Sequence, residues 1–333
     1  MKSTPYMRDL LLYSGQEDNY QVSSERIEKY LRVKADDSQI HRLCVHYGTL
    51  LEDELSSLEN SVVEKTTELL EDLETEEVIY AMSDGCLLPT RPHQVETEQI
   101  GSWKEMKLGR IFREKDHLNL GEKPNLIRSS IYVSHFGKHH DFTSKLSSII
   151  DPFVKLDERL VFINDGALWI ANFIAAYYPN ATDILDFYHA SEYLHEFSKV
   201  IFLEKKEATQ KAQWIDKQTL RLLNDEIQEV IKEIEQLKLN GTTKIKAQEK
   251  ILIYYRNNQL RMLYKSYKDR GLLIGSGPIE SAHRFVLQKR MKQSGQKWTK
   301  KGGQAIANIR IFHLNNQWDN VVSLINKHTS NAA

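Results

Sequence analysis

The spacing of apolar residues separates the chain into helical and strand-like regions. Residues 5–80 follow the helical period, with two short helices around a turn at 33–37 and then an acidic helix that runs to about Glu77. The first two helices predict a helix-turn-helix, but two amphipathic helices joined by a short turn are equally typical of a helical bundle. From residue 78 the period shortens, and three strand-like segments follow, bounded by Pro and Gly: 78–91, 102–113 and 129–137.

Strands and helices alternate in the middle of the chain. Residues 160–165 form a short apolar strand, a helix follows over 167–179, and 181–197 is a strand that runs into another helix. Meandering strands followed by this alternation predict an α/β fold with a mixed sheet and helices on both faces. Residues 200–268 return to a helical pattern, rich in Lys, Glu, Gln and Leu.

Three acidic residues lie at the ends of these elements. Asp84 and Asp165 each follow an apolar strand-like run and precede Gly, and Glu280 lies where a basic helix begins. Carboxylates at strand ends, with another from a helix packed across them, supply the oxygen ligands that Mg²⁺ prefers, and so predict two-metal phosphoryl transfer. Each residue also has a simpler interpretation: a hairpin turn for Asp84, a helix cap for Asp165, and a favourable first-turn position for Glu280.

The composition is that of a soluble globular protein, with 41% hydrophobic and 27% charged residues and a net charge of -1. The cysteines, Cys44 and Cys86, lack metal-binding spacing, which argues against a zinc finger or a disulfide framework and fits a reducing cytoplasm. No apolar run reaches the length of a membrane span, and no secretory signal is visible.

The near-zero net charge conceals a strong polarity along the chain. Residues 52–77 hold eleven acidic residues against one Lys, whereas 284–301 hold seven Lys or Arg and no acid. Phosphate binding depends on local patches, so this basic tract predicts contact with a nucleic-acid backbone, a solvated helix face being the alternative. The predicted contact residues are Arg284, Lys289, Arg290, Lys292, Lys297, Lys300 and Lys301, with Trp298 available to stack on a base or sugar.

Several segments together resemble the DDE transposases of bacterial insertion sequences, of the ISKra type. They include SDGCLLPTR, FINDGALWI and, most specifically, RMLYKSYKDRGLLIGSGPIESAHRFVLQKRMKQSGQKWTKKGGQAI over 261–306, and the resemblance covers nearly the whole chain. It implies an RNase H-like core, a mixed five-stranded sheet flanked by helices, in which Asp84, Asp165 and Glu280 form the metal-binding catalytic triad. The implied domains are an N-terminal helical region (1–77), the first part of the core (78–199), an all-helical insertion (200–270) and the C-terminal core helices (271–333).

A further motif, Asp186-Phe-Tyr-His189, matches the [C/D]xxH element that follows the second catalytic Asp in several transposase groups. Its place after a strand predicts that Asp186 lies near Asp165. Two interpretations stay open: Asp186 and His189 are accessory residues of the catalytic site, or His189 pairs with a nearby carboxylate and braces the strand–helix junction.

The resemblance implies Mg²⁺-dependent cleavage at transposon ends and strand transfer into double-stranded target DNA, with Mn²⁺ able to substitute. It also implies a homo-oligomer on DNA, cytoplasmic and nucleoid-associated. The alternatives are another RNase H-like nuclease, a domesticated non-catalytic DNA-binding protein, and a glycosidase built on paired carboxylates. The N-terminal region and helical insertion argue against the first, the intact acids against the second, and the basic tract against the third.

Overall fold

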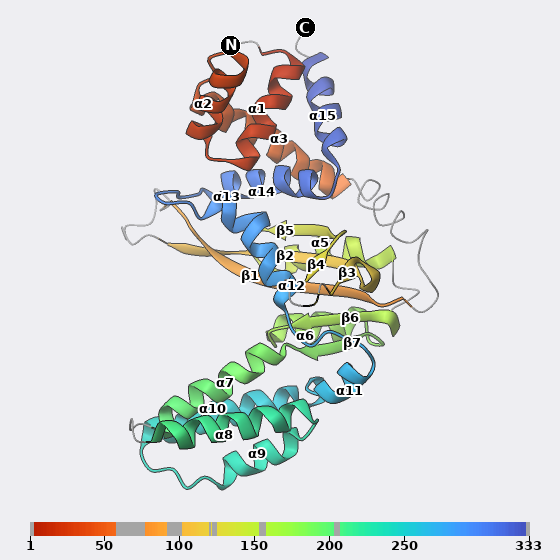
Figure 1. The fold of residues 1–333 in the computed structure, drawn as a ribbon. Helices are drawn as coiled ribbons and strands as arrows, with labels where there is room; N and C mark the ends of the chain where they lie inside the picture. The colour runs from red at the N-terminus through yellow and green to blue at the C-terminus, as the bar shows by residue number, and fades with distance from the viewer. Residues whose placement is uncertain are drawn as a thin grey trace. The chain divides into compact units, whose positions relative to one another are not determined.

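The computed structural model of the chain describes residues 3–57, 77–91, 102–119, 121, 125–152, 158–202 and 207–330. It divides into two compact units: unit 1 comprises Met1–Leu156 and Pro278–Ala333, and unit 2 comprises Asp157–Gly277. Both units combine strands with helices (Figure 1), so the predicted α/β class is confirmed. The acidic helix predicted to run to Glu77 falls largely on 58–76, outside the described residues.

The strands of unit 1 form an antiparallel meander in the order β5-β2-β1, as the sequence predicted. These strands are β1 (Ile79–Pro89), β2 (Trp103–Arg113) and β5 (Ile131–His135). A short 3-10 turn, η1 (Glu114–Asp116), leads from β2 into the small hairpin of β3 (His117–Leu118) and β4 (Leu126–Ile127).

Side chains alternate along β2 and define the two faces of this meander. A Cβ at Gly109 would approach Leu146 of α5 (His139–Ile150) to 2.8 Å, so α5 covers that face. The next residue, Arg110, points to the opposite face, where its side chain is buried and donates to the carbonyl of Pro278 at 2.7 Å. Pro278 lies at the start of α12 (Gly277–Ala282), which therefore crosses the second face.

The N-terminal and C-terminal helices pack into one bundle within unit 1 (Figure 1). Its members are α1 (Pro5–Glu17), α2 (Tyr20–Leu31), α3 (Asp37–Ser57), α14 (Lys300–Leu314) and α15 (Trp318–Ser330). The contact between α3 and α14 is close: a Cβ at Gly48 would come within 2.2 Å of the Ala305 carbonyl oxygen. The structure therefore groups 1–57 with 278–330, where the sequence analysis placed an N-terminal region apart from the C-terminal core helices.

The helix-turn-helix outline is present as α2 and α3, joined by a turn in which Arg32 adopts the left-handed conformation at φ 57°. One face of α3, with Ile40, Cys44, Tyr47 and Leu51, is buried in the bundle. The opposite face of α3 is open to solvent, so the bundle interpretation accounts for one face of this helix and leaves the other available for contacts.

Unit 2 begins with a parallel pair, β6 (Leu160–Asn164) and β7 (Thr182–Leu185), connected through α6 (Leu168–Tyr177). The chain then continues almost entirely as helix, as the pattern over 200–268 predicted. These helices are α7 (Phe187–Ile201), α8 (Ala208–Leu223), α9 (Ile227–Gln236), α10 (Thr242–Asn258), the 3-10 turn η4 (Gln259–Arg261) and α11 (Tyr264–Asp269).

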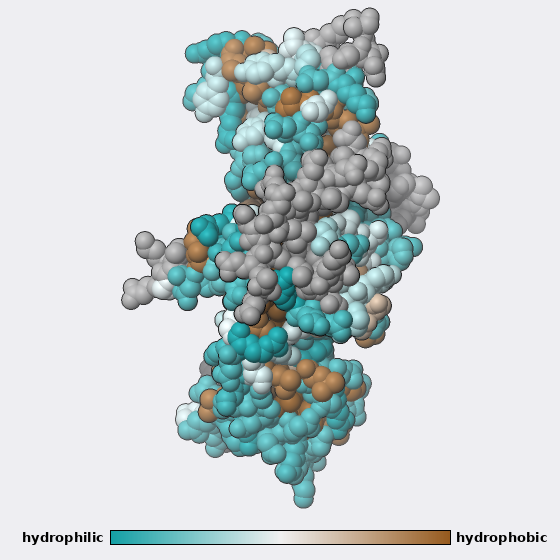
Figure 2. Space-filling view, turned by 90° about the vertical axis from the view of Figure 1, so that its right-hand side faces the viewer, coloured by the Kyte–Doolittle hydropathy of each residue, from teal (hydrophilic) through white to brown (hydrophobic). Residues whose placement is uncertain are grey.

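Hydrophilic side chains predominate on the face drawn in Figure 2. Within the described ranges, none of the helices is both long and apolar enough to cross a membrane.

Candidate active site and basic groove

Asp84 lies in the middle of β1 rather than at a strand end, so that part of the prediction is wrong. It stands opposite Leu108 of β2, and the ladder continues to Pro89 opposite Trp103, which also excludes a hairpin turn at Asp84-Gly85. The strand continues because the alternation continues: Cys86 and Leu88 are buried while Leu87 is exposed.

The helix that carries Glu280 crosses the face of the strand that carries Asp84. Cross-strand partners share a face, and Leu108 is two residues from Arg110, so Asp84 lies on the face that α12 covers. One turn beyond Glu280, the Nε2 atom of His283 lies 3.6 Å from Oδ2 of Asp84. Residues three apart on a helix are neighbours, so Glu280 belongs to the same side of this helical stretch as His283.

His283 was not identified from the sequence. It opens the π-helix η5 (His283–Gln288) that continues α12, and it is 2% exposed. Burial lowers the pKa of His283 to about 4, so the imidazole is neutral near pH 7 and adds no charge beside Asp84. Its position, three residues after Glu280, is the only signal in the sequence that could have indicated it.

Asp165 directly follows β6, as predicted, and is exposed. One carboxylate oxygen accepts from the backbone N–H of Ala167 at 2.9 Å, so Asp165 helps to shape the turn before α6. Asp165 belongs to unit 2, whereas Asp84 and Glu280 belong to unit 1. The three predicted carboxylates are therefore carried by two units.

The donor chemistry of these residues suits Mg²⁺, which takes oxygen ligands and keeps several waters. The side chain of Asp84 is 36% exposed, and Asp165 and Glu280 are exposed residues, so none is sealed from an ion and its waters. Within the described ranges, no three His, Cys, Asp or Glu side chains form a metal-binding group.

Asp186 is fully buried, and each of its two carboxylate oxygens accepts a hydrogen bond. One oxygen accepts from the backbone N–H of Tyr188 at 2.9 Å and so caps α7, and the other accepts from the Ser276 hydroxyl at 2.5 Å. Burial raises the pKa of Asp186, while these hydrogen bonds oppose the increase. The Nε2 atom of His189 lies 3.8 Å from Asp186, and its Nδ1 atom lies 3.4 Å from Glu192. This geometry favours the bracing interpretation over a metal-ligand role.

We expect Asp186→Ala to lower the free energy of unfolding by about 2–3 kcal/mol, because it removes a helix cap and leaves the Ser276 hydroxyl without its acceptor. Asp186→Asn should cost less, since Asn also caps helices. Urea unfolding of both variants measures the difference. An unchanged unfolding curve for Asp186→Ala, with a large rise in the Mg²⁺ requirement, would instead assign Asp186 to the metal site.

Arg290, expected to contact DNA, is fully buried. Its Nε atom donates to the Gly15 carbonyl at 2.9 Å, and its guanidinium lies 4.8 Å from the Tyr20 ring and 5.3 Å from the Trp298 ring. Trp298 is 6% exposed, and its indole N–H donates to the Met291 carbonyl. In this structure Arg290 joins α13 (Lys289–Met291) to the N-terminal helices, and both side chains are buried.

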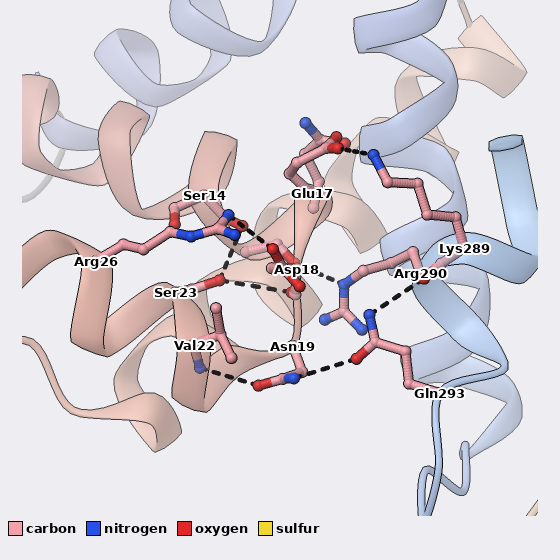
Figure 3. A network of polar contacts seen from close by, with 12 residues as sticks. Ser14, Glu17, Asp18, Asn19, Val22, Ser23, Arg26, Lys289, Arg290 and Gln293 are labelled. Atoms are coloured by element: carbon pink, nitrogen blue, oxygen red, sulfur yellow. Dashed lines mark hydrogen bonds and ion pairs between the residues drawn. The ribbon is translucent and has the colours of Figure 1, made fainter.

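Lys289 is exposed but forms an ion pair with Glu17 of α1 (Figure 3), which reduces its net positive field. Nearby, Asn19 donates to Gln293 at 3.2 Å. Arg284, Lys292, Lys297, Lys300 and Lys301 are the exposed cations of the predicted tract that remain.

A basic groove forms where the end of β1 meets the start of α14. The backbone N–H of Trp298 donates to the Pro89 carbonyl, and the backbone N–H of Arg91 donates to the Trp298 carbonyl, both at 2.9 Å. These two bonds bring Arg91 beside Lys300 and Lys301. Three adjoining cavities of about 810, 590 and 420 Å³ all include Arg91 in their walls. The exposed cations that line them, here called the basic groove, are Arg91, Lys104, Lys138, Lys297, Lys300 and Lys301.

The open face of α3 borders the same groove through His41, Val45 and Thr49. The acidic residues in its walls are Asp37, Glu52 and Glu105, and two of them are paired with lysines outside the groove: Glu52 with Lys145 and Glu105 with Lys107. The groove therefore keeps a positive balance, which suits a phosphate backbone. Arg91, Lys104 and Lys138 were not predicted from the sequence, because none of them lies in a run of basic residues.

The sequence matches no protein-family model and has no significant match among curated proteins.

Proposed function

We propose that the protein is a DDE transposase that cleaves DNA at the ends of an insertion sequence and joins them to target DNA. The observation that carries the proposal is the crossing of the Glu280 helix over the strand of Asp84, in the same unit as the basic groove. A glycosidase needs paired carboxylates but no such groove for a polyanion.

The proposed RNase H-like core requires a mixed five-stranded sheet. The antiparallel meander β5-β2-β1 and the parallel pair β6-β7 supply both kinds of pairing. The proposal requires Asp165, at the end of β6, to share the metal site with Asp84 of β1. Glu280, from the helix that crosses β1, then completes the triad.

In this proposal Asp84, Asp165 and Glu280 hold Mg²⁺, with Mn²⁺ as a substitute. The chemistry that the bound ions supply is activation of a water or a 3′-hydroxyl and stabilisation of the leaving oxygen. The neutral imidazole of His283 lies beside the Asp84 carboxylate, and the basic groove binds the phosphate backbone of the duplex. The protein is expected to act as a homo-oligomer on DNA in the bacterial cytoplasm.

The proposal is tested with end-labelled DNA taken from both sides of the reading frame, incubated with the protein and Mg²⁺ or Mn²⁺. A transposase should cut at inverted repeats in that DNA and transfer the new 3′ ends. Binding without cleavage under all conditions would favour a domesticated DNA-binding protein, and preferential cleavage of RNA–DNA hybrids would favour another nuclease of this fold.

We expect the triple substitution of Arg91, Lys300 and Lys301 by Ala to weaken binding to all duplexes alike. Each phosphate contact releases counterions, so the slope of log affinity against log salt should fall by about 2–3. Lys289→Ala is the matched control, because Glu17 already pairs with the charge that it removes. Filter binding over a range of salt measures the slopes, and equal slopes for the triple variant and the wild-type protein would exclude this groove as the DNA site.

A further inference from the structure

The turn that presents Asp165 is held by a tyrosine from a distant helix of unit 2. The hydroxyl of Tyr254, in α10, donates to the backbone carbonyl of Asp165 at 3.0 Å. The Tyr254 ring is itself fixed by parallel stacking on Tyr193 of α7, with ring centroids 3.7 Å apart and planes within 6°. The Nζ atom of Lys250 lies 5.2 Å from the centroid of the Tyr193 ring, and this cation–π contact also helps to hold that ring. The ring pair therefore determines where the Tyr254 hydroxyl is directed.

An arginine just beyond α10 holds the other side of the same turn. Nη2 of Arg261 donates to Oδ1 of Asn164 at 2.5 Å and to Oδ1 of Asp183 at 2.9 Å. Its Nε atom lies 2.8 Å from the second Asp183 oxygen without the alignment of a hydrogen bond, so it contributes as charge. Asn164 completes the triangle by donating to Asp183 at 3.0 Å, and its Oδ1 also accepts from the N–H of Gly166 at 3.1 Å.

The contacts of Arg261 with Asn164 and Asp183 are largely sheltered from water. Asn164 is 2% exposed, and the side chains of Arg261 and Asp183 are 13% and 18% exposed. Gly166 has φ 86°, and a Cβ there would lie 2.7 Å from Leu185 and 3.3 Å from the Tyr254 hydroxyl. The turn is thus packed tightly against α10, and only glycine suits its conformation and its space.

We infer that the helical segment Thr242–Arg261 is the positioning element for Asp165, acting through Tyr254 and Arg261. The inference rests on the proposed function of Asp165 as a metal ligand. Neither residue is placed at the reacting atoms; one fixes the Asp165 carbonyl and the other fixes the side chain of Asn164, its neighbour in the chain. A turn held on both sides can present its carboxylate to a metal ion with little reorganisation, which is what a preorganised site requires.

The test compares Tyr254→Phe with Tyr255→Phe. The second is a matched control, because it removes a hydroxyl at the adjacent position that donates to the Ala190 carbonyl of α7 and not to the turn. Hydrogen exchange of the Gly166 and Ala167 amides, measured without metal, reports on the turn directly. Tyr254→Phe should speed this exchange about fivefold, the effect of one lost hydrogen bond, and raise the Mg²⁺ concentration for half-maximal DNA cleavage. Tyr255→Phe should lower the melting temperature but leave the exchange rate of the turn amides and the Mg²⁺ requirement unchanged.

The outcomes separate this inference from the proposed function. Unchanged exchange in Tyr254→Phe overturns the positioning role whether or not the protein cleaves DNA. Faster exchange with an unchanged Mg²⁺ requirement also overturns it, because the turn would then be held for stability alone. If the wild-type protein cleaves no DNA, the proposed function fails, and the metal-dependent part of this inference fails with it, while the exchange data still decide whether Tyr254 holds the turn. Arg261→Gln serves as a second variant at the other contact, and Arg261→Lys should rescue part of its loss by retaining the charge.

Discussion

Replacing any one of Asp84, Asp165 or Glu280 is expected to abolish Mg²⁺-dependent DNA cleavage while DNA binding persists. Loss of a residue that only supports a metal ligand lowers metal affinity or activity by about 10–100-fold, so loss of a ligand itself should lower cleavage activity by more than about a hundredfold. DNA binding should persist because none of these carboxylates lines the basic groove. The measurement is cleavage of end-labelled DNA by Asp84→Ala, Asp165→Ala and Glu280→Gln, with filter binding in parallel.

Glu229→Gln is the matched control for Glu280→Gln. Glu229 is also an exposed glutamate in the first turn of a helix, here α9, but it lies in the helical part of unit 2. The Glu229→Gln protein should cleave DNA like the wild-type protein. Normal cleavage by any of the three carboxylate variants would remove that residue from the proposed site, and would return it to its simpler role as a turn, cap or first-turn residue.

Arg290→Ala is expected to lower the free energy of unfolding by about 3–5 kcal/mol, because it opens a cavity between two aromatic rings and leaves a buried carbonyl unpaired. The rings are those of Tyr20 and Trp298, and the carbonyl is that of Gly15. Lys289→Ala, one position earlier, should change stability by less than about 1 kcal/mol, because its ion pair with Glu17 is exposed. Urea unfolding of the two variants provides the comparison.

The same two variants, Arg290→Ala and Lys289→Ala, also decide which part of the basic tract faces DNA. A normally stable Arg290→Ala protein with weakened DNA affinity would return Arg290 to the DNA interface and contradict its role in the core. Loss of stability in Arg290→Ala, with Lys289→Ala folding normally, would confirm that the strongest run of positive charge in the sequence is partly a structural element.

Much of the local structure follows from the sequence because hydrophobic period depends on neighbouring residues alone. The strands over 79–89, 103–113 and 160–164 were expected from short apolar or alternating runs. Asp165 was placed correctly because the apolar run of β6 ends just before it. At Asp84 the same reasoning failed, since Asp-Gly favours a turn locally, but the alternation of Cys86, Leu87 and Leu88 and the pairing with β2 continue the strand.

Only the tertiary structure decided which charged residues are buried and which residues meet. Arg290 and Lys289 are adjacent cations in the sequence, yet one is enclosed between Tyr20 and Trp298 and the other is exposed. His283 reaches Asp84, and Arg91 joins Lys300, across separations of about two hundred residues. The sequence by itself determined the helices, the strands and the acidic and basic residues available for chemistry. The packing of β1 against the helices after Pro278 determined their partners, because burial and pairing depend on residues that are distant along the chain.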